Sequence, residues 1–410
     1  MGFDPLGFCV VLEGSKQLTI AQPWLHPLKV NEPELLGTLH WRMPQDVENT
    51  EACWVDAWCC KGGCVTSSHK VGVVVIGRNE GDRLIRSLES VADGTRPVVY
   101  VDSGSTDGSC EAARDRGVTV INLDLSIPFT AARARNAGFE RLCELHPDVA
   151  YVQFIDGDCE VVAGWLEAAA ATLDQHPDVV AVCGWRRERY PDRSPYNRIC
   201  DVEWRLGPVG VTTQFGGDVM IRATAFAAVG GYDSSVIAAE DDELSVRLRQ
   251  ASGSILRIDQ NSTLHDANIH RLAQWWQRAK RCGYAYAQVS SIHGAPPEQK
   301  FKQEIRRAWL WGVIAPLGAI VLSPFTFGLS LIVLGRYPLT AIRTMIGTHK
   351  RGFSWNESMV WGVSCGVSVI PEAFGVIKFV RDCLFHKQHE IIEYKGAQPA
   401  AIKSIQATGR

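Results

Sequence analysis

The sequence lacks an excess of charge of either sign. Its 42 basic and 45 acidic residues leave a formal net charge of −3. Nucleic-acid-binding proteins usually carry a strongly basic face, so this balance gives no support for a nucleic-acid partner. A Gly-x-Gly-x-x-Gly turn, which a dehydrogenase needs after its first strand, is also absent, because the chain reads "IGRNEG" there. The sequence therefore favours neither a nucleic-acid-binding protein nor a dehydrogenase.

A secretory leader is also missing from the first thirty residues, which have no basic start, long apolar run or small-residue cleavage site. Nine of the 13 cysteines stand apart from one another, as buried thiols in a reducing compartment do. We therefore expect a protein that faces the cytosol. The other four cysteines lie in "CWVDAWCCKGGC", but their spacing matches neither common zinc pattern. Residues 1–69 are thus an N-terminal extension of unassigned role.

From residue 71 onward, short apolar runs alternate with helical patterns. Strands are predicted at "VGVVVI", "VVYVD", "VTVIN", "VAYVQFID" and "DVVAVCG". This alternation predicts an α/β fold with a doubly wound, Rossmann-like sheet. Ligands of such sheets bind at the carboxyl ends of the strands. Asp102 ends the second predicted strand and Asp156 ends the fourth, so both fall where a ligand is expected.

Two groups of carboxylates stand out at such ends. Asp156 and Asp158 follow the fourth strand in "IDGDCE", where a simple Asp-Gly turn and a metal site are both open interpretations. Carboxylate oxygens suit Mg²⁺, which proteins hold with one or two carboxylates and substrate phosphates. The second group, "EDDE", opens a predicted helix at Glu240, where a carboxylate can act as a general base. Asp102 could accept from a ribose hydroxyl or a base N–H, whereas Asp107 is explained by helix capping.

The C-terminal part contains a long uncharged segment. Residues 309–335 carry no charged side chain, which is enough length to cross a bilayer. Pro316 and Pro324 interrupt it, so a kinked or re-entrant helix is possible. Basic residues flank both ends, so the segment enters and returns if both flanks are cytoplasmic. The flanking residues are Lys300, Lys302, Arg306 and Arg307 on one side, and Arg336, Arg343, Lys350 and Arg351 on the other.

A buried hairpin in a soluble domain is the alternative for this segment. We favour membrane contact, with an amphipathic basic linker over 271–308, apolar membrane-associated helices over 309–385 and a tail over 386–410. The second apolar stretch, Met359 to Ile370, is too short to span alone. Trp275 and Trp276 could lie at the membrane interface or pack in a core. The expected location is an inner or plasma membrane, with the active site on the cytoplasmic side.

Several motifs between Lys70 and Ile269, in order, resemble those of glycosyltransferase family 2, whose catalytic domain has the GT-A fold. "IGRNEGDRL" looks like the first strand and Asn-Glu turn of the family, and "VDSGSTDGS" is similar to its "DDGSTDGT" loop. "ARARNAGFE" resembles its Ala-Arg-Asn helix, and "IDGD" its Asp-x-Asp motif. "FGGDVMIRATAFAAVGGYD" and "AAEDDELSVRLRQASG" resemble its acceptor-side and catalytic-base motifs. The resemblance strengthens the metal interpretation of Asp156 and Asp158 and implies a GT-A mixed sheet over residues 70–270.

The resemblance implies an inverting, metal-dependent transfer from a nucleotide-diphosphate sugar to a saccharide or lipid-linked acceptor, in polysaccharide or glycolipid synthesis. Asp241 is the implied base, with Asp242 as the alternative. Mn²⁺ or Mg²⁺ is expected on Asp158, with Asp156 and with His265 or His270 as further ligands. The implied donor-binding residues are Gly77, Asn79, Glu80, Asp102, Ser103, Arg133, Arg135 and Asp156. The implied acceptor-side residues are Gly216, Gly217, Asp218 and Glu240.

Two departures from the family pattern matter. The second-strand motif reads "DSGS" where the family has "DDGS", which puts the donor base in doubt. "LAQWWQRAKR" lacks the Gln-x-x-Arg-Trp pattern of processive synthases. Two other functions remain as alternatives. A sugar-nucleotide-forming nucleotidyltransferase should have a glycine-rich basic loop after the first strand, and a non-catalytic membrane scaffold should have lost Asp158 or Asp241.

Overall fold

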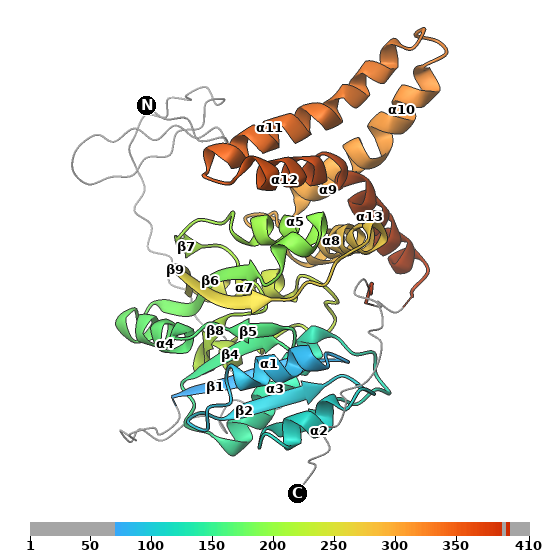
Figure 1. The fold of residues 1–410 in the computed structure, drawn as a ribbon. Coiled ribbons are helices and arrows are strands. Elements are labelled where there is room, and N and C mark those ends of the chain that lie inside the picture. Colours follow the sequence, from blue (N-terminus) through green and yellow to red (C-terminus); the bar gives the residue numbers. More distant parts are fainter. Residues whose placement is uncertain (1–69, 388–390, 394–410) are drawn as a thin grey trace, which may run out of the picture. The chain divides into compact units, whose positions relative to one another are not determined.

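The computed structural model describes residues 70–387 and 391–393 (Figure 1). The predictions for the N-terminal extension, its cysteine cluster and most of the C-terminal tail lie outside the described residues. Within the described part, a sheet with flanking helices is followed by a series of C-terminal helices.

The sheet has nine strands in the order β3-β2-β1-β4-β8-β6-β9-β5, and β7 pairs with β9. The first four strands are parallel to one another, whereas β8 runs antiparallel to both β4 and β6. The predicted mixed α/β sheet is therefore confirmed. The strands are β1 Val71–Gly77, β2 Val98–Asp102, β3 Thr119–Asn122, β4 Tyr151–Asp156, β5 Cys159–Val161, β6 Val179–Glu188, β7 Gly210–Thr212, β8 Met220–Arg222 and β9 Ser254–His265.

The sheet is buried on both faces, which explains the unbroken apolar runs of its central strands. Along β1, Val74 belongs to one core with Leu142 of α3, whereas Val73 and Val75 belong to a second core with Trp165 of α4. Adjacent side chains of a strand point to opposite faces, so β1 contributes to both cores. The helices around the sheet are α1 Asp82–Glu89, α2 Ser109–Arg114, α3 Ala131–Leu145, α4 Trp165–Gln175, α5 Pro195–Trp204, α6 Ala223–Ala228 and α7 Glu240–Gln250.

One antiparallel pairing brings two distant segments together. The short strand β5 pairs with the end of β9, and this register places Cys159 opposite His265. The backbone N–H of Asp266 also donates to the backbone carbonyl of Asp158, at 3.0 Å. The Asp-x-Asp motif after β4 and the histidine that ends β9 are therefore neighbours in the fold.

The uncharged segment forms two arms of a helical hairpin. One continuous helix, Lys302–Leu322, is built from α9 Lys302–Trp309, η2 Leu310–Ile314 and α10 Ala315–Leu322, and a second covers Leu329–Lys350. Both are long and apolar enough to cross a membrane. The second arm consists of η3 Leu329–Gly335 and α11 Arg336–Lys350, so Arg336 and Arg343, which were predicted to flank the segment, lie within a helix.

The chain continues with α12 Trp355–Val367 and α13 Val369–Leu384. These two helices meet at a 42° bend and together pass the same length and composition test. The short apolar stretch from Met359 to Ile370 is thus the centre of a longer bent pair. The described helices therefore provide two candidate spans, or three if the bent pair is one broken span.

Helix α8, Leu272–His293, packs tightly against α13. A Cβ added at Gly283 would lie 1.9 Å from the carbonyl oxygen of Glu372, and one at Gly375 would lie 2.0 Å from that of Lys280. Only glycine allows the two backbones to approach so closely. Trp275 is buried, and its indole N–H donates to the hydroxyl of Ser364 at 3.2 Å. Core packing, rather than a position at the membrane interface, is therefore what the structure shows for Trp275.

Candidate active site

A cavity of about 760 Å³ opens at the carboxyl ends of β1 and β4. Its wall combines the turn after β1, the Asp-x-Asp motif, the first turn of α7 and one side of α8. Most of the residues that the sequence assigns to donor, acceptor, metal and base roles lie in this wall. They are Gly77, Asn79, Glu80, Ser103, Arg135, Asp156, Asp158, Gly216, Gly217, Glu240, Asp241, Asp242 and His265.

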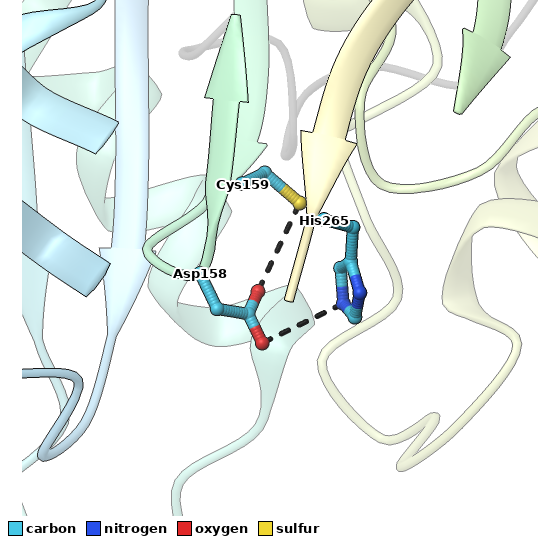
Figure 2. Close-up of side chains that lie close together, drawn as sticks. All are labelled: Asp158, Cys159 and His265. Atoms are coloured by element: carbon cyan, nitrogen blue, oxygen red, sulfur yellow. Dashed lines mark hydrogen bonds and ion pairs between the residues drawn. The ribbon is translucent and has the colours of Figure 1, made fainter. Parts of the chain in front are cut away.

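Asp158, Cys159 and His265 form a buried group whose potential metal-binding atoms all lie within 4.8 Å of one another (Figure 2). Nε2 of His265 lies 3.5 Å from Oδ2 of Asp158. A carboxylate and an imidazole are suitable ligands for Mn²⁺, whereas a thiol prefers softer metals. Burial also raises the pKa of the Cys159 thiol well above its usual value. The residues present therefore fit a hard divalent cation held by Asp158 and His265.

Asp156, the other carboxylate of the motif, makes a different contact. Its Oδ1 accepts a hydrogen bond from Arg135 at 2.8 Å, and 29% of its side chain is exposed to the cavity. Asp156 is not part of the buried group around Asp158. The two acids of "IDGD" thus have different surroundings, which the sequence motif does not reveal.

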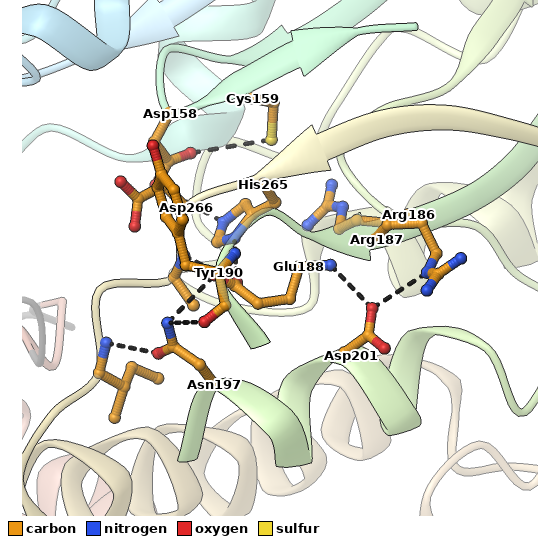
Figure 3. A network of polar contacts seen from close by, with 12 residues as sticks. Asp158, Cys159, Arg186, Arg187, Glu188, Tyr190, Asn197, Asp201, His265 and Asp266 are labelled. Carbon is orange, nitrogen blue, oxygen red and sulfur yellow. Dashed lines mark hydrogen bonds and ion pairs between the residues drawn. The ribbon is translucent and has the colours of Figure 1, made fainter. Parts of the chain in front are cut away.

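A buried carboxylate lies behind His265. Oε2 of Glu188 lies 3.9 Å from Nδ1 of His265 and accepts from the backbone N–H of Ala267 at 3.0 Å. Its other oxygen accepts from the backbone N–H of Tyr190 and from the side chain of Asn197 (Figure 3). Glu188 therefore fixes the chain on both sides of the histidine ring.

Asp241, in the first turn of α7, faces the same cavity. Burial raises its pKa to about 7; the carboxylates of Glu240 and Asp156 add to the rise, and the Arg135 guanidinium opposes it. Tyr232 donates a hydrogen bond to Oδ1 of Asp241 at 3.1 Å. A carboxylate with a pKa near neutrality can accept a proton from a substrate hydroxyl more effectively than an ordinary surface Asp.

Asp242, the alternative base, is paired with a lysine. Nζ of Lys300 lies 2.7 Å from its Oδ1. Burial raises the pKa of Asp242, and Lys300 acts in the opposite direction. The cation lies closer to Asp242 than Arg135 lies to Asp241, which is 3.7 Å from the guanidinium, so Asp241 is the better candidate for the base.

Arg135 of α3 joins three of these acids. Its buried guanidinium lies 2.6 Å from Glu240, 2.8 Å from Asp156 and 3.7 Å from Asp241. A Cβ added at Gly217 would lie 2.4 Å from the guanidinium, so a larger residue there would displace Arg135 from these acids. Arg135 therefore holds these acids together from within the cavity wall, and its predicted role in donor binding stays a prediction.

The expected donor-binding residues are divided. Gly77, Asn79, Glu80 and Ser103 lie in the cavity wall, whereas both oxygens of Asp102 are used locally. Asp102 accepts from the hydroxyl of Tyr100 and from the backbone N–H groups of Gly104 and Ser105.

Arg133 donates to backbone carbonyls of residues 124–128 and lies outside the cavity wall, so its role in donor binding stays a prediction that these contacts do not support. On the acceptor side, Asp218 pairs with Arg186 at 2.7 Å and also accepts from Ser262 and Thr263. It therefore holds an arginine of the cavity wall in place.

Several cavity residues escaped the sequence motifs. Arg278, Arg281 and Tyr286 come from α8, and their spacing of three and five residues on one helix was the available signal. Arg78 lines the cavity over the ring of Phe129, with its guanidinium carbon 4.6 Å from the ring centre. Glu393, which follows α13, lies 3.7 Å from Arg78 and also lines the cavity. The helical part and the tail thus complete a site that the motifs place in the sheet.

Residues 72–229 match the family model described as glycosyl transferase family 2. The chain carries a family 2 glycosyltransferase domain. The sheet order and the cavity at its carboxyl edge agree with the GT-A fold implied by this family. The match ends before α7, so the proposed catalytic Asp241 lies outside the matched range.

Among the relatives, glycosyltransferase AglE of Haloferax volcanii is 32% identical over 111 residues, which cover 25% of this chain and 35% of that protein. The chain therefore aligns with about a third of that relative. Succinoglycan biosynthesis protein ExoA of Rhizobium meliloti is 24% identical over 303 residues, covering 67% of this chain and 90% of that protein. A solved mannosyltransferase, PcManGT from Pyrobaculum calidifontis in complex with GDP-Man and Mn²⁺, is 18% identical with a TM-score of 0.49, covering 80% and 92% of the two chains.

Proposed function

We propose that the protein is an inverting, metal-dependent glycosyltransferase that moves a sugar from a nucleotide-diphosphate sugar to an acceptor hydroxyl. One observation supports this most directly. A carboxylate with a pKa near 7 and a buried carboxylate–imidazole pair face one cavity at the carboxyl edge of the sheet. The first suits a base for the acceptor, and the second suits a cation for the donor diphosphate.

In the proposed reaction, Asp241 accepts the proton of the acceptor hydroxyl while that oxygen attacks the anomeric carbon. The bond from the anomeric carbon to the diphosphate oxygen breaks, and the nucleoside diphosphate leaves with the bonding electrons. The hydrogen bond from Tyr232 and the nearby Arg135 hold the Asp241 carboxylate in place. Asp158 and His265 would hold Mn²⁺ or Mg²⁺, which supplies positive charge for the departing diphosphate.

The acceptor is proposed to be a saccharide or a lipid-linked saccharide, in polysaccharide or glycolipid synthesis. The name of ExoA, a succinoglycan biosynthesis protein, supports a role in polysaccharide synthesis. Arg278 and Arg281 of α8 line the cavity and belong to the helix that packs on the bent apolar pair. A lipid-linked acceptor could approach along this side, so the enzyme is proposed to work at the cytoplasmic face of a membrane.

The test is a screen of the full-length protein, purified in detergent, against a panel of nucleotide sugars with Mn²⁺ or Mg²⁺. Release of the nucleoside diphosphate is measured, with the Asp241→Asn variant as the matched control. We expect one donor to give nucleotide release that depends on the metal and on Asp241. Equal release by wild type and variant, or no release from any donor, contradicts the proposal. Pyrophosphate formation from a sugar phosphate and a nucleoside triphosphate would instead indicate the nucleotidyltransferase.

A further inference from the structure

A second cleft, of about 290 Å³, lies apart from the active-site cavity. One wall is formed by β6 and β9, including Trp185, Arg187 and Asn261. The other is the loop Arg351–Phe353, which joins α11 to α12. None of these residues belongs to the wall of the active-site cavity, so the proposed sugar transfer gives them no role.

The loop wall is fixed to the sheet domain. The guanidinium of Arg205 pairs with Asp201 at 2.6 Å and with Glu357, and it lies over the ring of Phe353 at 4.6 Å. On the other side, Nδ1 of His349 lies 2.8 Å from the backbone carbonyl oxygen of Phe353. Because a carbonyl oxygen can only accept, Nδ1–H is the donor of this hydrogen bond. The loop wall is therefore held in place by Arg205 on one side and by His349 on the other.

Two guanidinium groups of the cleft wall, those of Arg187 and Arg351, have N–H groups available for a ligand. Arg187 uses Nε for Asp201, and within the described part of the chain its two terminal nitrogens make no hydrogen bond. Arg351 is exposed and has no carboxylate within 4 Å among the described residues. The acids are engaged: Asp259, an exposed carboxylate of the cleft wall, accepts from the indole of Trp185 at 2.8 Å through Oδ1, and Asp201 and Glu357 pair with Arg205. Two guanidinium groups thus remain for an anion, and guanidinium binds phosphate through paired N–H groups.

The position of the loop indicates where that anion comes from. Arg351 directly follows Lys350, the last residue of the candidate span Leu329–Lys350. Trp355, 57% exposed, begins the next apolar helix. Tryptophan and basic residues at the end of a membrane helix mark the level of the lipid headgroups. With Leu329–Lys350 inserted in a membrane, the cleft would open at the level of the headgroups, where lipid phosphates lie.

We propose that this cleft binds the phosphate of an anionic membrane lipid, with Arg187 and Arg351 as its ligands. Basic pockets beside membrane helices bind anionic headgroups in this way. Because Arg187 belongs to β6 and Arg351 to the α11–α12 loop, a bound headgroup would join the sheet domain to the helices. This inference concerns a site separate from the proposed sugar transfer and does not depend on it.

The experiment titrates phosphatidylglycerol into the full-length protein in neutral detergent and follows the thermal midpoint and the lipid adducts seen by native mass spectrometry. Phosphatidylcholine and inorganic phosphate form the other two arms. The Arg187→Ala/Arg351→Ala double variant is compared with Lys350→Ala, which removes the neighbouring charge but leaves the cleft wall intact. We expect wild type and Lys350→Ala to bind phosphatidylglycerol alike and the double variant to bind it roughly 30-fold more weakly, as expected for two basic groups.

Three outcomes overturn the proposal. Equal weakening by Lys350→Ala would mean that overall surface charge, and not the cleft, attracts the lipid. An unchanged double variant would remove Arg187 and Arg351 as ligands. Stabilisation by inorganic phosphate without any by phosphatidylglycerol would leave a phosphate site but no lipid site. The single variants Arg187→Ala and Arg351→Ala serve as replacements if the double variant does not fold, each with about a fivefold expected loss.

Discussion

Nε2 of His265 lies 3.5 Å from Oδ2 of Asp158, although more than 100 residues separate the two in the sequence and His265 lies beyond the range matched by the family model. The pairing of β5 with β9 creates this contact. The side chains are buried, and Nδ1 of His265 is directed to Glu188, which leaves Nε2 on the side of Asp158. The first prediction follows from this contact.

We expect Asp158→Asn and His265→Ala to lose most of the affinity for Mn²⁺, because each removes one of two proposed ligands. Cys159→Ser should bind Mn²⁺ nearly as well as wild type, since a thiol is a poor ligand for this cation. Electron paramagnetic resonance of unbound Mn²⁺, measured with a nucleoside diphosphate present, gives the affinities. Loss of binding in Cys159→Ser with retention in His265→Ala would show that the metal site is assigned to the wrong side chains.

The second prediction concerns Asp241. Asp241→Asn should lower kcat by roughly 10²–10⁴-fold, as typical for loss of a general base, and leave the donor affinity nearly unchanged. Asp242→Asn should have a much smaller effect, because that carboxylate is held by Lys300. Steady-state kinetics of both variants with the donor found in the screen tests this. A larger loss in Asp242→Asn would exchange the two roles.

The pH dependence of the wild type should report the same group. A base acts only when it is deprotonated, so log kcat/KM should rise with pH to a plateau above about pH 7, the pKa to which burial raises Asp241.

The raised pKa of Asp241 also makes the free energy of unfolding depend on pH. Because the folded-state pKa lies above that of the unfolded chain, ionised Asp241 destabilises the fold, and this cost develops between about pH 4 and pH 7. Asp241→Asn should therefore raise the thermal midpoint at pH 8 more than at pH 5.

The third prediction concerns Glu188, which we expect to orient His265. The two oxygens of Glu188 accept hydrogen bonds from three N–H groups, and the carboxylate faces His265. Glu188→Gln removes the negative charge and leaves only one oxygen that can accept. Loss of a hydrogen-bonded partner typically lowers metal affinity by about 10–100-fold; because Nδ1 of His265 lies 3.9 Å from Glu188, beyond hydrogen-bond distance, we expect a loss at the lower end of that range. Asp382→Asn is the matched control, because it changes a buried carboxylate that pairs with Lys378 and Arg381 of α13 and does not line the cavity. Equal losses of Mn²⁺ affinity in both variants would indicate general destabilisation in place of a positioning role.

The fourth prediction concerns the hairpin of Lys302–Leu322 and Leu329–Lys350. The first arm has 21 residues and is therefore about 30 Å long, enough to cross a bilayer. The intact protein should stay with membranes in high salt, because burial of apolar surface is not screened by ions. Thr326→Cys, in the turn between the arms, should react with a membrane-impermeant maleimide added to intact cells, with the wild type as background. Release of the protein by salt would contradict membrane insertion, and a protected turn would indicate a re-entrant hairpin.

The sequence was most informative where local patterns decide structure. The apolar runs of β1, β2 and β4 predicted the central strands, because strands buried on both faces require them. The acidic opening of α7 was recognised because carboxylates favour a helix N-terminus. The placing of most motif residues in one cavity followed from the rule that strand ends gather at one edge of the sheet.

Side-chain contacts between elements that are distant in the sequence were harder to predict. The sequence does not reveal that Arg135 would pair with Asp156 and Glu240, since those contacts depend on how α3 and α7 approach the sheet. The same limit applies to Asp102, whose oxygens are used by its own turn. The role of α8 was hidden for a different reason. Its basic and aromatic residues fit a membrane surface as well as a cavity wall, and only the packing on α13 decides between them.

That packing has a consequence for exchanging parts between related enzymes. Gly283 and Gly375 let α8 and α13 touch backbone to backbone, while the other side of α8 carries Arg278 and Arg281 into the cavity. A chimera that joined this sheet domain to the helices of a relative at residue 270 would replace part of its own substrate pocket. A chimera should therefore exchange α8 together with α13. We expect such a chimera to take its acceptor preference from the source of the helices and its donor preference from the source of the sheet.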